Sequence, residues 1–201
     1  MNVVFDFGKV LVDYDFDILL KDLFEDPADR ALFLSEVGNQ DFIDACDKGD
    51  MTFENLVDQL KEKYPQWAWQ FQQYHDRQLE VITGEVPGMR GLIMRLKGAG
   101  YKIYGLTNWS SAVYDVIEKF DILQLVDYRL ISSEEKLIKP TREIYDRFCA
   151  KFGLKAEECV FTDDREVNVE GARAAGMKAI LFKNAADYER QLSQYIEVPQ
   201  Q

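Results

Sequence analysis

The stretch Val3-Val4-Phe5-Asp6-Phe7-Gly8-Lys9-Val10-Leu11 decides the fold, because it embeds one carboxylate in a short apolar run. Such a run at the start of a chain predicts a buried strand of a parallel sheet. Open α/β sheets bind ligands outside the carboxyl ends of their strands, so Asp6 is a candidate site residue. By itself, the stretch is equally consistent with an aspartate that caps a turn. The other motifs of the chain are needed to separate these interpretations.

Length and composition limit the classes of protein to which the chain can belong. Its 201 residues are 47% hydrophobic and 30% charged, which suits one large domain or one domain with an insert. The formal net charge of -12 argues against binding nucleic acid or an anionic membrane through a broad basic face. A small anionic substrate stays compatible if a metal, a lysine or a helix N-terminus meets its charge locally.

Cysteine and histidine usage points to a reducing compartment and away from histidine chemistry. Cys46, Cys149 and Cys159 are far apart and in no metal-binding pattern, so we expect a reduced, cytoplasmic protein. The sole histidine, His75, has no partner for a triad or a zinc site. We find no secretory signal and no apolar run of membrane-spanning length, and expect a monomer or a homodimer.

An all-helical insert is predicted directly after the first strand. Residues 12–17 resemble a polar exit from the sheet, and residues 17–78 show apolar positions at helical spacing with no convincing strand. Thr52 is a candidate N-cap. We therefore predict an all-helical insert, which we place at residues 16–83. The core domain then comprises residues 1–15 and 84–201.

From Val86 onward, helical and strand patterns alternate. Predicted strands cover 102–106, 128–131, 159–162 and 179–182, and predicted helices cover 89–97, 112–120, 142–152 and 167–175. This order predicts the α/β class, with a doubly wound parallel sheet and right-handed crossovers. We expect the tail after Ser193 to be weakly ordered.

Polar residues stand at the ends of the predicted strands or before helices: Asp6, Thr107-Asn108, Lys139 and Asp163-Asp164. Because strand ends in a doubly wound sheet converge on one edge, residues far apart in sequence can share a site. Carboxylates without histidine or cysteine suit magnesium better than zinc. A lysine with hydroxyl and amide donors suits a phosphoryl group.

These ordered motifs resemble those of the haloacid dehalogenase (HAD) superfamily, in its branch with a helical cap inserted after the first strand. The resemblance implies that Asp6 is a nucleophile that forms an aspartyl-phosphate. It implies that the Thr107 hydroxyl and the Asn108 N–H bind the phosphoryl group. Lys139 would steady both the nucleophile and the bound phosphate. The substrate would be a small phosphate ester.

The resemblance also implies a magnesium site. Asp6, the backbone carbonyl of Gly8 and Asp164 would hold Mg²⁺. Asp163 would lie behind these ligands or pair with Lys139.

One departure from the family pattern concerns the general acid. Most HAD phosphatases carry a second aspartate where this chain has Gly8. Haloacid dehalogenases also lack that aspartate, but they usually depart from the magnesium motif that Asp163-Asp164 retains. The first motif is most similar to a bacterial subgroup that includes the α-D-glucose-1-phosphate phosphatase. We therefore expect a magnesium-dependent phosphatase of a small metabolite such as a sugar phosphate.

Other functions are compatible with the same motifs. A haloacid dehalogenase would attack carbon with Asp6, and a non-catalytic protein could keep the fold for binding; a phosphomutase would need the missing acid. Asp13 or Asp15 could replace that acid, although a solvated turn is the simpler interpretation of each. Within the cap, Asp44, Trp67 and Trp69 are candidate substrate contacts. The aromatic cluster of Trp67, Trp69, Phe71 and Tyr74 is more simply the core of the cap.

Overall fold

The computed structural model describes residues 1–199, in which five parallel strands form one sheet of order β5-β4-β1-β6-β7. The strands are β1 (Asn2–Phe5), β4 (Ile103–Thr107), β5 (Tyr128–Ile131), β6 (Cys159–Asp163) and β7 (Lys178–Leu181). From the central β1, the chain winds to β4 and β5 on one side and then to β6 and β7 on the other. The strand order therefore reverses between β1 and β6, where doubly wound sheets bind their ligands. The predicted α/β class and the doubly wound sheet are confirmed.

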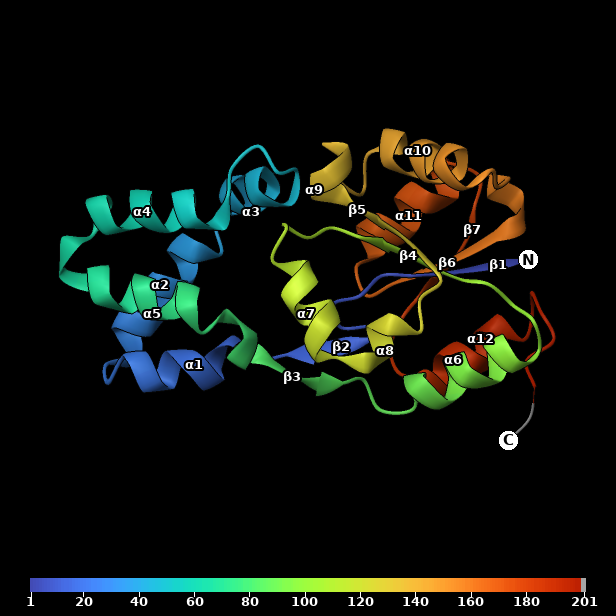
Figure 1. The fold of residues 1–201 in the computed structure, drawn as a ribbon, viewed down its shortest axis with the longest axis horizontal. Helices are drawn as coiled ribbons and strands as arrows, with labels where there is room; N and C mark the ends of the chain where they lie inside the picture. The colour runs from blue at the N-terminus through green and yellow to red at the C-terminus, as the bar shows by residue number, and fades with distance from the viewer. Residues whose placement is uncertain (200–201) are drawn as a thin grey trace.

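Helices cover both faces of this sheet (Figure 1). The elements are α6 (Met89–Gly98), α7 (Val113–Lys119), α8 (Asp121–Gln124), α9 (Ser132–Glu135), α10 (Arg142–Phe152), η3 (Ala156–Glu158), α11 (Glu166–Ala174) and α12 (Ala185–Leu192). Alternate residues of β1 serve opposite faces, because side chains alternate along a strand. Val3 and Phe5 pack in one core cluster with residues of α6, α7 and α12, whereas Val4 packs in another with residues of α10 and α11.

The segment between β1 and β4 is largely helical and lies beside the sheet (Figure 1). It contains α1 (Phe16–Leu23), α2 (Pro27–Val37), α3 (Gln40–Asp47), α4 (Phe53–Lys63), η1 (Pro65–Trp67), α5 (Ala68–Asp76) and η2 (Gln78–Val81). Thr52 caps α4 as predicted, since its Oγ1 accepts a 3.1 Å hydrogen bond from the N–H of Asn55. We refer to these helices as the cap.

Aromatic side chains form the interior of the cap, as the sequence predicts for most of the cluster. Phe33 stacks on Phe71 with ring centroids 4.6 Å apart, and Trp67 packs beside them. Trp67, Phe71 and Tyr74 are buried. The prediction is wrong for Trp69, whose side chain is exposed because it lies on the outer face of α5. Burial of the aromatic rings gives the cap its own core.

The first strand is shorter than predicted. It ends at Phe5, and the chain then turns, because the N–H groups of Leu11 and Val12 both donate to the carbonyl of Phe7. Lys9 takes a left-handed conformation in this turn, with φ 58°. Asp6 therefore lies at the carboxyl end of β1, where the rest of the predicted strand curls away from the sheet.

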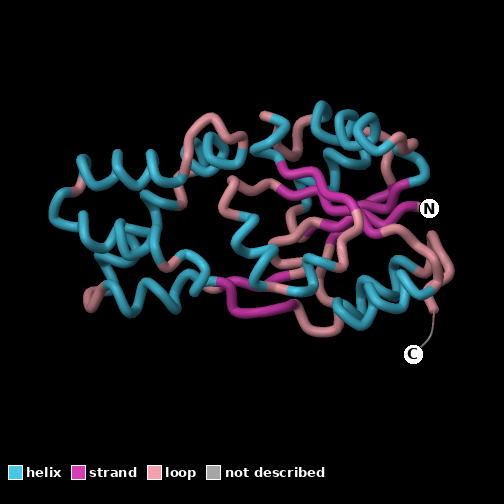
Figure 2. Tube along the Cα trace, in the orientation of Figure 1, coloured by secondary structure: helices cyan, strands magenta, loops and turns pink. Residues whose placement is uncertain are grey.

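Two short strands that the sequence does not reveal connect the cap to the sheet. β2 (Val12–Tyr14) pairs antiparallel with β3 (Ile82–Glu85), and Figure 2 shows this ribbon between the cap and the central sheet. We expected a polar exit from the sheet in place of β2 and the end of the helical insert in place of β3. Both contain residues that strands disfavour, Asp13 and Gly84, and their pairing spans the whole insert. Such non-local pairing leaves no periodic signal in the sequence.

The remaining expectations concern the tail, the cysteines and the membrane. Ile196, in the tail after Ser193 that we expected to be weakly ordered, packs in the core, and residues 200–201 lie outside the described chain. Cys46, Cys149 and Cys159 are free thiols. Within residues 1–199, none of the helices combines the length and the apolar character needed to cross a membrane.

Candidate active site

Three carboxylates meet where the strand order of the sheet reverses. Asp6 follows β1, Asp163 is the last residue of β6, and Asp164 follows it. One carboxylate oxygen from each lies within 4.8 Å of one from each of the others. Because β1 and β6 are adjacent parallel strands, their carboxyl ends bring residues almost 160 positions apart into one cluster.

Lys139 is buried between two of these carboxylates. Its Nζ lies 3.0 Å from Oδ1 of Asp6 and 2.7 Å from Oδ2 of Asp163, and it donates to the carbonyl of Leu106. The backbone of Lys139 is held by the side chain of Asn108. Asn108 Oδ1 accepts from the N–H of Lys139 at 2.8 Å, and Asn108 Nδ2 donates to its carbonyl at 3.0 Å. Lys139 is therefore held both at its backbone and at its ammonium group.

Burial and mutual repulsion set the charges of this cluster. The pKa of Asp6 is raised to about 7, mainly because the side chain is buried; Lys139 opposes this rise and the nearby Asp163 adds to it. Burial also raises the pKa of Asp164, and Asp163 adds to that shift. The pKa of Asp163 lies below its usual range because Lys139 outweighs the effect of burial. The cluster thus holds more negative charge than one lysine neutralises, and a bound cation would relieve the excess.

Both carboxylate oxygens of Asp163 accept hydrogen bonds from protein groups. Its Oδ1 accepts from the N–H of Arg165 at 2.9 Å and from Asn168 Nδ2 at 3.0 Å. Its Oδ2 accepts from Lys139 at 2.7 Å and from Asn168 Nδ2 at 3.1 Å. Of the two arrangements expected for Asp163, this geometry favours pairing with Lys139.

Several oxygen atoms of the cluster have no hydrogen-bond partner within residues 1–199. They include the buried Oγ1 of Thr107 and Oδ2 of Asp6. The turn after β1 uses the carbonyls of Phe7 and Val12 and leaves that of Gly8 free of backbone hydrogen bonds. These hard oxygen donors, with Asp164, fit a magnesium ion better than a thiophilic metal.

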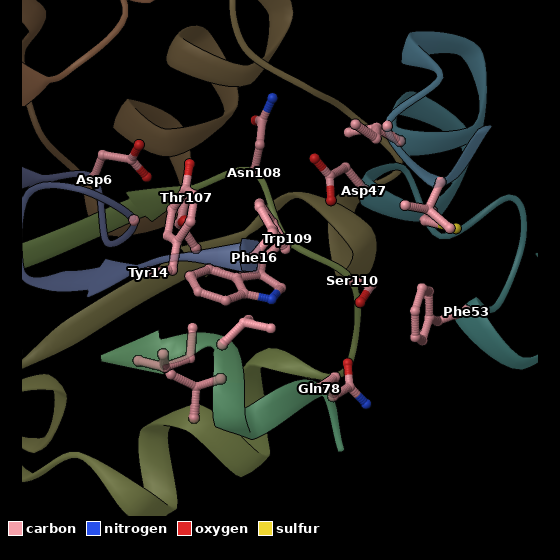
Figure 3. A pocket seen from close by; sticks show the side chains of 18 of the residues that line it. Asp6, Tyr14, Phe16, Asp47, Phe53, Gln78, Thr107, Asn108, Trp109 and Ser110 are labelled. Carbon is pink, nitrogen blue, oxygen red and sulfur yellow. The ribbon is translucent and has the colours of Figure 1, made fainter. Parts of the chain in front are cut away.

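A cavity of about 400 Å³ lies beside the cluster and extends from Asp6 to the cap residues Asp47 and Phe53 (Figure 3). Asp6, Thr107, Asn108 and Lys139 lie in the wall on the sheet side. The cap contributes mostly apolar side chains, among them Val37, Ile43, Phe53, Leu56, Tyr74 and Leu79. The cavity therefore has one strongly polar end and one apolar end.

The predicted cap contacts do not lie in this cavity. Asp44, Trp67 and Trp69 are absent from its wall, whereas Asp47, Gln40 and Gln78 are part of it. Asp44 instead accepts a 2.6 Å hydrogen bond from Gln40. The helical spacing of Ile43, Cys46 and Asp47 could have identified the face of α3 that points inward.

Asp13 and Asp15, the other candidate acids, are engaged in contacts outside the cavity. Asp13 pairs with Nζ of Lys9 at 2.6 Å, which lowers the pKa of Asp13, and Asp15 caps α1 by accepting from the N–H of Asp17. Neither lies in the cavity wall. A Cβ atom on Gly8 would come 3.3 Å from Cε1 of Tyr14. The ring of Tyr14 thus crowds the space that a side chain at position 8 would enter.

The class of protein is thus an α/β protein with a doubly wound sheet, carboxylates and a lysine where the strand order reverses, and a helical cap beside the cavity. Residues 2–176 match the sequence model of a family described as "haloacid dehalogenase-like hydrolase". The chain therefore belongs to this hydrolase family.

Individual relatives agree with that assignment. The chain is 30% identical over 135 residues to a glyceraldehyde 3-phosphate phosphatase of Pyrococcus furiosus, a match that covers 65% of this chain and 56% of that protein. The chain thus spans little more than half the length of that relative. It is 23% identical to a D-ribitol-5-phosphate phosphatase of Bacteroides thetaiotaomicron, with 96% of each chain covered.

The fold is similar to that of a HAD family enzyme of Bacteroides thetaiotaomicron. The TM-score is 0.77 at 19% identity, with 94% of this chain and 97% of the other covered. That enzyme was crystallised as an aspartate-to-alanine mutant with magnesium and inorganic phosphate. At this identity, the likeness establishes the fold.

Proposed function

We propose that this protein is a magnesium-dependent phosphatase that hydrolyses a small phosphate ester through an aspartyl-phosphate on Asp6. The observation that carries the proposal is the arrangement of Asp6 beside Lys139, with the unpartnered hydroxyl of Thr107 in the same cavity. Relatives named as phosphatases support it.

Each residue of the cluster has a distinct role in this proposal. Asp6 attacks the phosphorus atom and displaces the leaving oxygen; water then hydrolyses the acyl phosphate. Thr107 Oγ1 and the N–H of Asn108 donate to the phosphoryl oxygens, and Lys139 stabilises their negative charge. Asp163 positions Lys139 through their 2.7 Å ion pair.

Magnesium would be held by Asp6, the carbonyl of Gly8 and Asp164. When bound, the ion would neutralise phosphoryl charge and so allow a carboxylate to approach a phosphate dianion. The raised pKa values of Asp6 and Asp164 and the unpartnered Oδ2 of Asp6 support this ligand set. Asp163 is left out of this ligand set, because both of its carboxylate oxygens already accept hydrogen bonds from protein donors.

The side chains that line the cavity indicate which kind of substrate it can hold. The sequence suggests a metabolite such as a sugar phosphate, yet side chains such as Val37, Ile43 and Leu79 would leave sugar hydroxyls without partners. We therefore favour a phosphate ester whose leaving group is partly apolar. Its charged end would meet the cluster, and its hydrocarbon or aromatic part would lie under the cap.

Further expectations complete the proposal. We retain residues 1–15 and 84–201 as the core domain and 16–83 as the cap domain. The free thiols of the described chain agree with a reducing, cytoplasmic setting. A monomer or homodimer is still expected.

A panel of phosphate esters, assayed for inorganic phosphate with Mg²⁺ and again with a chelator, tests this function. We expect release that needs Mg²⁺ and is lost in Asp6→Asn but kept in Asp58→Asn, an exposed control on α4. The panel includes a 2-haloacid, assayed for halide, as the test of the dehalogenase alternative. Metal-independent halide release would replace the phosphatase proposal with that alternative. Phosphate release that persists in Asp6→Asn would refute the nucleophile.

A further inference from the structure

The site described so far has no acid for the leaving oxygen, because position 8 is glycine and Asp13 and Asp15 lie outside the cavity. We propose that Asp47, on cap helix α3, is the general acid of this enzyme. This inference rests on the proposed phosphatase function. It assigns to the cap a catalytic group that the sheet does not supply.

The position of Asp47 in the cavity is the first argument. Figure 3 shows the carboxyl groups of Asp6 and Asp47 on opposite sides of Asn108, each directed toward the space between them. A phosphoryl group held beside Asp6 would turn its leaving oxygen away from that nucleophile, because attack is in line. The leaving oxygen would therefore point toward the side of the cavity on which Asp47 lies.

The backbone of Asp47 is fixed to the core domain, which is the second argument. Ser132, at the start of α9, donates from Oγ to the carbonyl of Asp47 at 2.5 Å and accepts from the N–H of Trp109 at 2.9 Å. Lys136 donates to the carbonyl of Gly49. Gly49 has φ 68°, and a Cβ there would lie 2.7 Å from the carbonyl of Ser133. The end of α3 thus lies close against α9. The loop that contains Trp109 and the backbone of Asp47 are both hydrogen-bonded to the side chain of Ser132.

The surroundings of Asp47 favour its protonated form. The pKa of Asp47 is raised to about 7, mainly by burial and also by Asp44 on the same helix. Lys139 and Arg165, which face Asp47 from the core, lower it but do not cancel the effect. A general acid works best when its pKa is close to the operating pH.

Other titratable groups of the described cavity fit this role less well. Burial raises the pKa of Tyr14 to about 12, so its phenol is a much weaker acid at neutral pH. His75 lies outside the cavity wall, where it stacks on Phe53 and contacts Asp76.

The proposed step balances in atoms and charge. As Asp6 forms its bond to phosphorus, the bond from phosphorus to the leaving oxygen breaks, and that oxygen takes the proton of the Asp47 carboxyl. The resulting Asp47 carboxylate then accepts a proton from the water that attacks the acyl phosphate. Breakage of the bond from phosphorus to Asp6 releases inorganic phosphate and restores the Asp6 carboxylate and the protonated Asp47 carboxyl.

Two probe substrates of similar shape isolate this step. The leaving oxygen of 4-nitrobenzyl phosphate is far more basic than that of 4-nitrophenyl phosphate, so only the former needs protonation in the transition state. We expect Asp47→Asn to lower kcat/KM for the benzyl ester more than for the phenyl ester, by a further factor of ~10². Asp47→Glu should recover part of that difference. Asp41→Asn, exposed on the same helix, should leave the ratio unchanged.

The pH profile gives a second readout. In the wild type, the ratio of benzyl to phenyl ester turnover should fall as pH rises through about 7, because Asp47 ionises there. In Asp47→Asn the ratio should be flat. The ratio cancels titrations that affect both substrates alike.

Three outcomes would overturn the inference. These are an equal loss on both esters in Asp47→Asn, an unchanged pH dependence of the ratio, or a selective loss in Tyr14→Phe instead. Circular dichroism and the melting temperature establish that each variant is folded. Absence of turnover of both esters by the wild type would instead contradict the proposed phosphatase function.

Discussion

Ser132 Oγ donates a 2.5 Å hydrogen bond to the backbone carbonyl of Asp47, so the first residue of α9 holds one specific residue of the cap helices. Ser132 is fully buried, and the same hydroxyl accepts from the N–H of Trp109 in the loop that follows β4. The loop proposed to bind phosphate and the helix proposed to carry the general acid thus share one side chain.

Replacement of Ser132 by alanine tests this link. Ser132→Ala leaves the N–H of Trp109 and the carbonyl of Asp47 without this partner, which should destabilise the fold by about 1–3 kcal/mol. It should also lower turnover of 4-nitrobenzyl phosphate more than that of 4-nitrophenyl phosphate. Denaturant titration and the two assays measure these effects. Ser35→Ala, on an exposed part of α2, is the matched control. A loss equal for both esters would separate Ser132 from Asp47.

Lys139 is predicted to hold the carboxylate cluster together. Lys139→Met keeps most of the side-chain volume but removes the only cation within hydrogen-bonding reach of Asp6 among the described residues. Breaking a buried ion pair costs about 3–5 kcal/mol, so we expect a large loss of stability as well as loss of activity. Chemical denaturation with and without Mg²⁺ measures the loss. Lys155→Met, at an exposed ion pair with Glu158, should change stability by less than about 0.5 kcal/mol. Similar stability changes in both variants would contradict the prediction.

Asp47→Asn is predicted to stabilise the protein while it impairs catalysis. The pKa of Asp47 is about 7 in the fold against an ordinary 3.8, so ionisation disfavours the folded state. This cost begins near the ordinary pKa as pH rises, and is complete above about 7. The variant should therefore gain stability over the wild type between pH 5 and pH 8.

The gain should be about 1 kcal/mol at pH 8, a discounted value because the side chain faces a solvent-accessible cavity. That corresponds to a melting temperature higher by roughly 2–4 °C. Thermal melts at the two pH values measure it, with Asp41→Asn as control. A variant that is less stable than the wild type at pH 8 would show that the carboxylate is favourably paired.

Magnesium should stabilise the folded protein through Asp164. A ligand at 100 times its Kd stabilises the folded state by about 2.7 kcal/mol, so the melting temperature should rise with Mg²⁺ concentration. In Asp164→Ala this dependence should vanish, because the variant loses one of the three clustered carboxylates proposed to hold the ion. Thermal melts over a magnesium series measure it, with Ca²⁺ as the selectivity control. An unchanged dependence in Asp164→Ala would remove Asp164 from the ligand set.

Much of the fold and of the cluster could be predicted from the sequence, for a physical reason. Strands such as Cys159–Asp163 are buried on both faces and therefore form continuous apolar runs. In a doubly wound sheet, such runs end at one edge, so Asp6, Thr107 and Asp163 could be assigned to one site before their distances were known. Local patterns and one topological rule suffice for that step.

The parts that sequence reasoning missed depend on long-range contacts. β2 and β3 pair across the insert, and neither has a periodic pattern of its own. Asp47 is one of many acidic residues on exposed cap helices, and only the packing of α3 against α9 turns it toward the cavity. Asp44 carries the same chemistry one turn earlier but lies outside the cavity wall.

The central claim is that Asp6 becomes phosphorylated during turnover. The most direct test is a rapid acid quench of the protein with substrate and Mg²⁺, followed by mass spectrometry of the peptide that contains Asp6. We predict a phosphate adduct on Asp6 that is hydroxylamine-sensitive and absent from Asp6→Asn. Phosphate release at full rate with no adduct on Asp6, or with an adduct on another residue, would contradict the account.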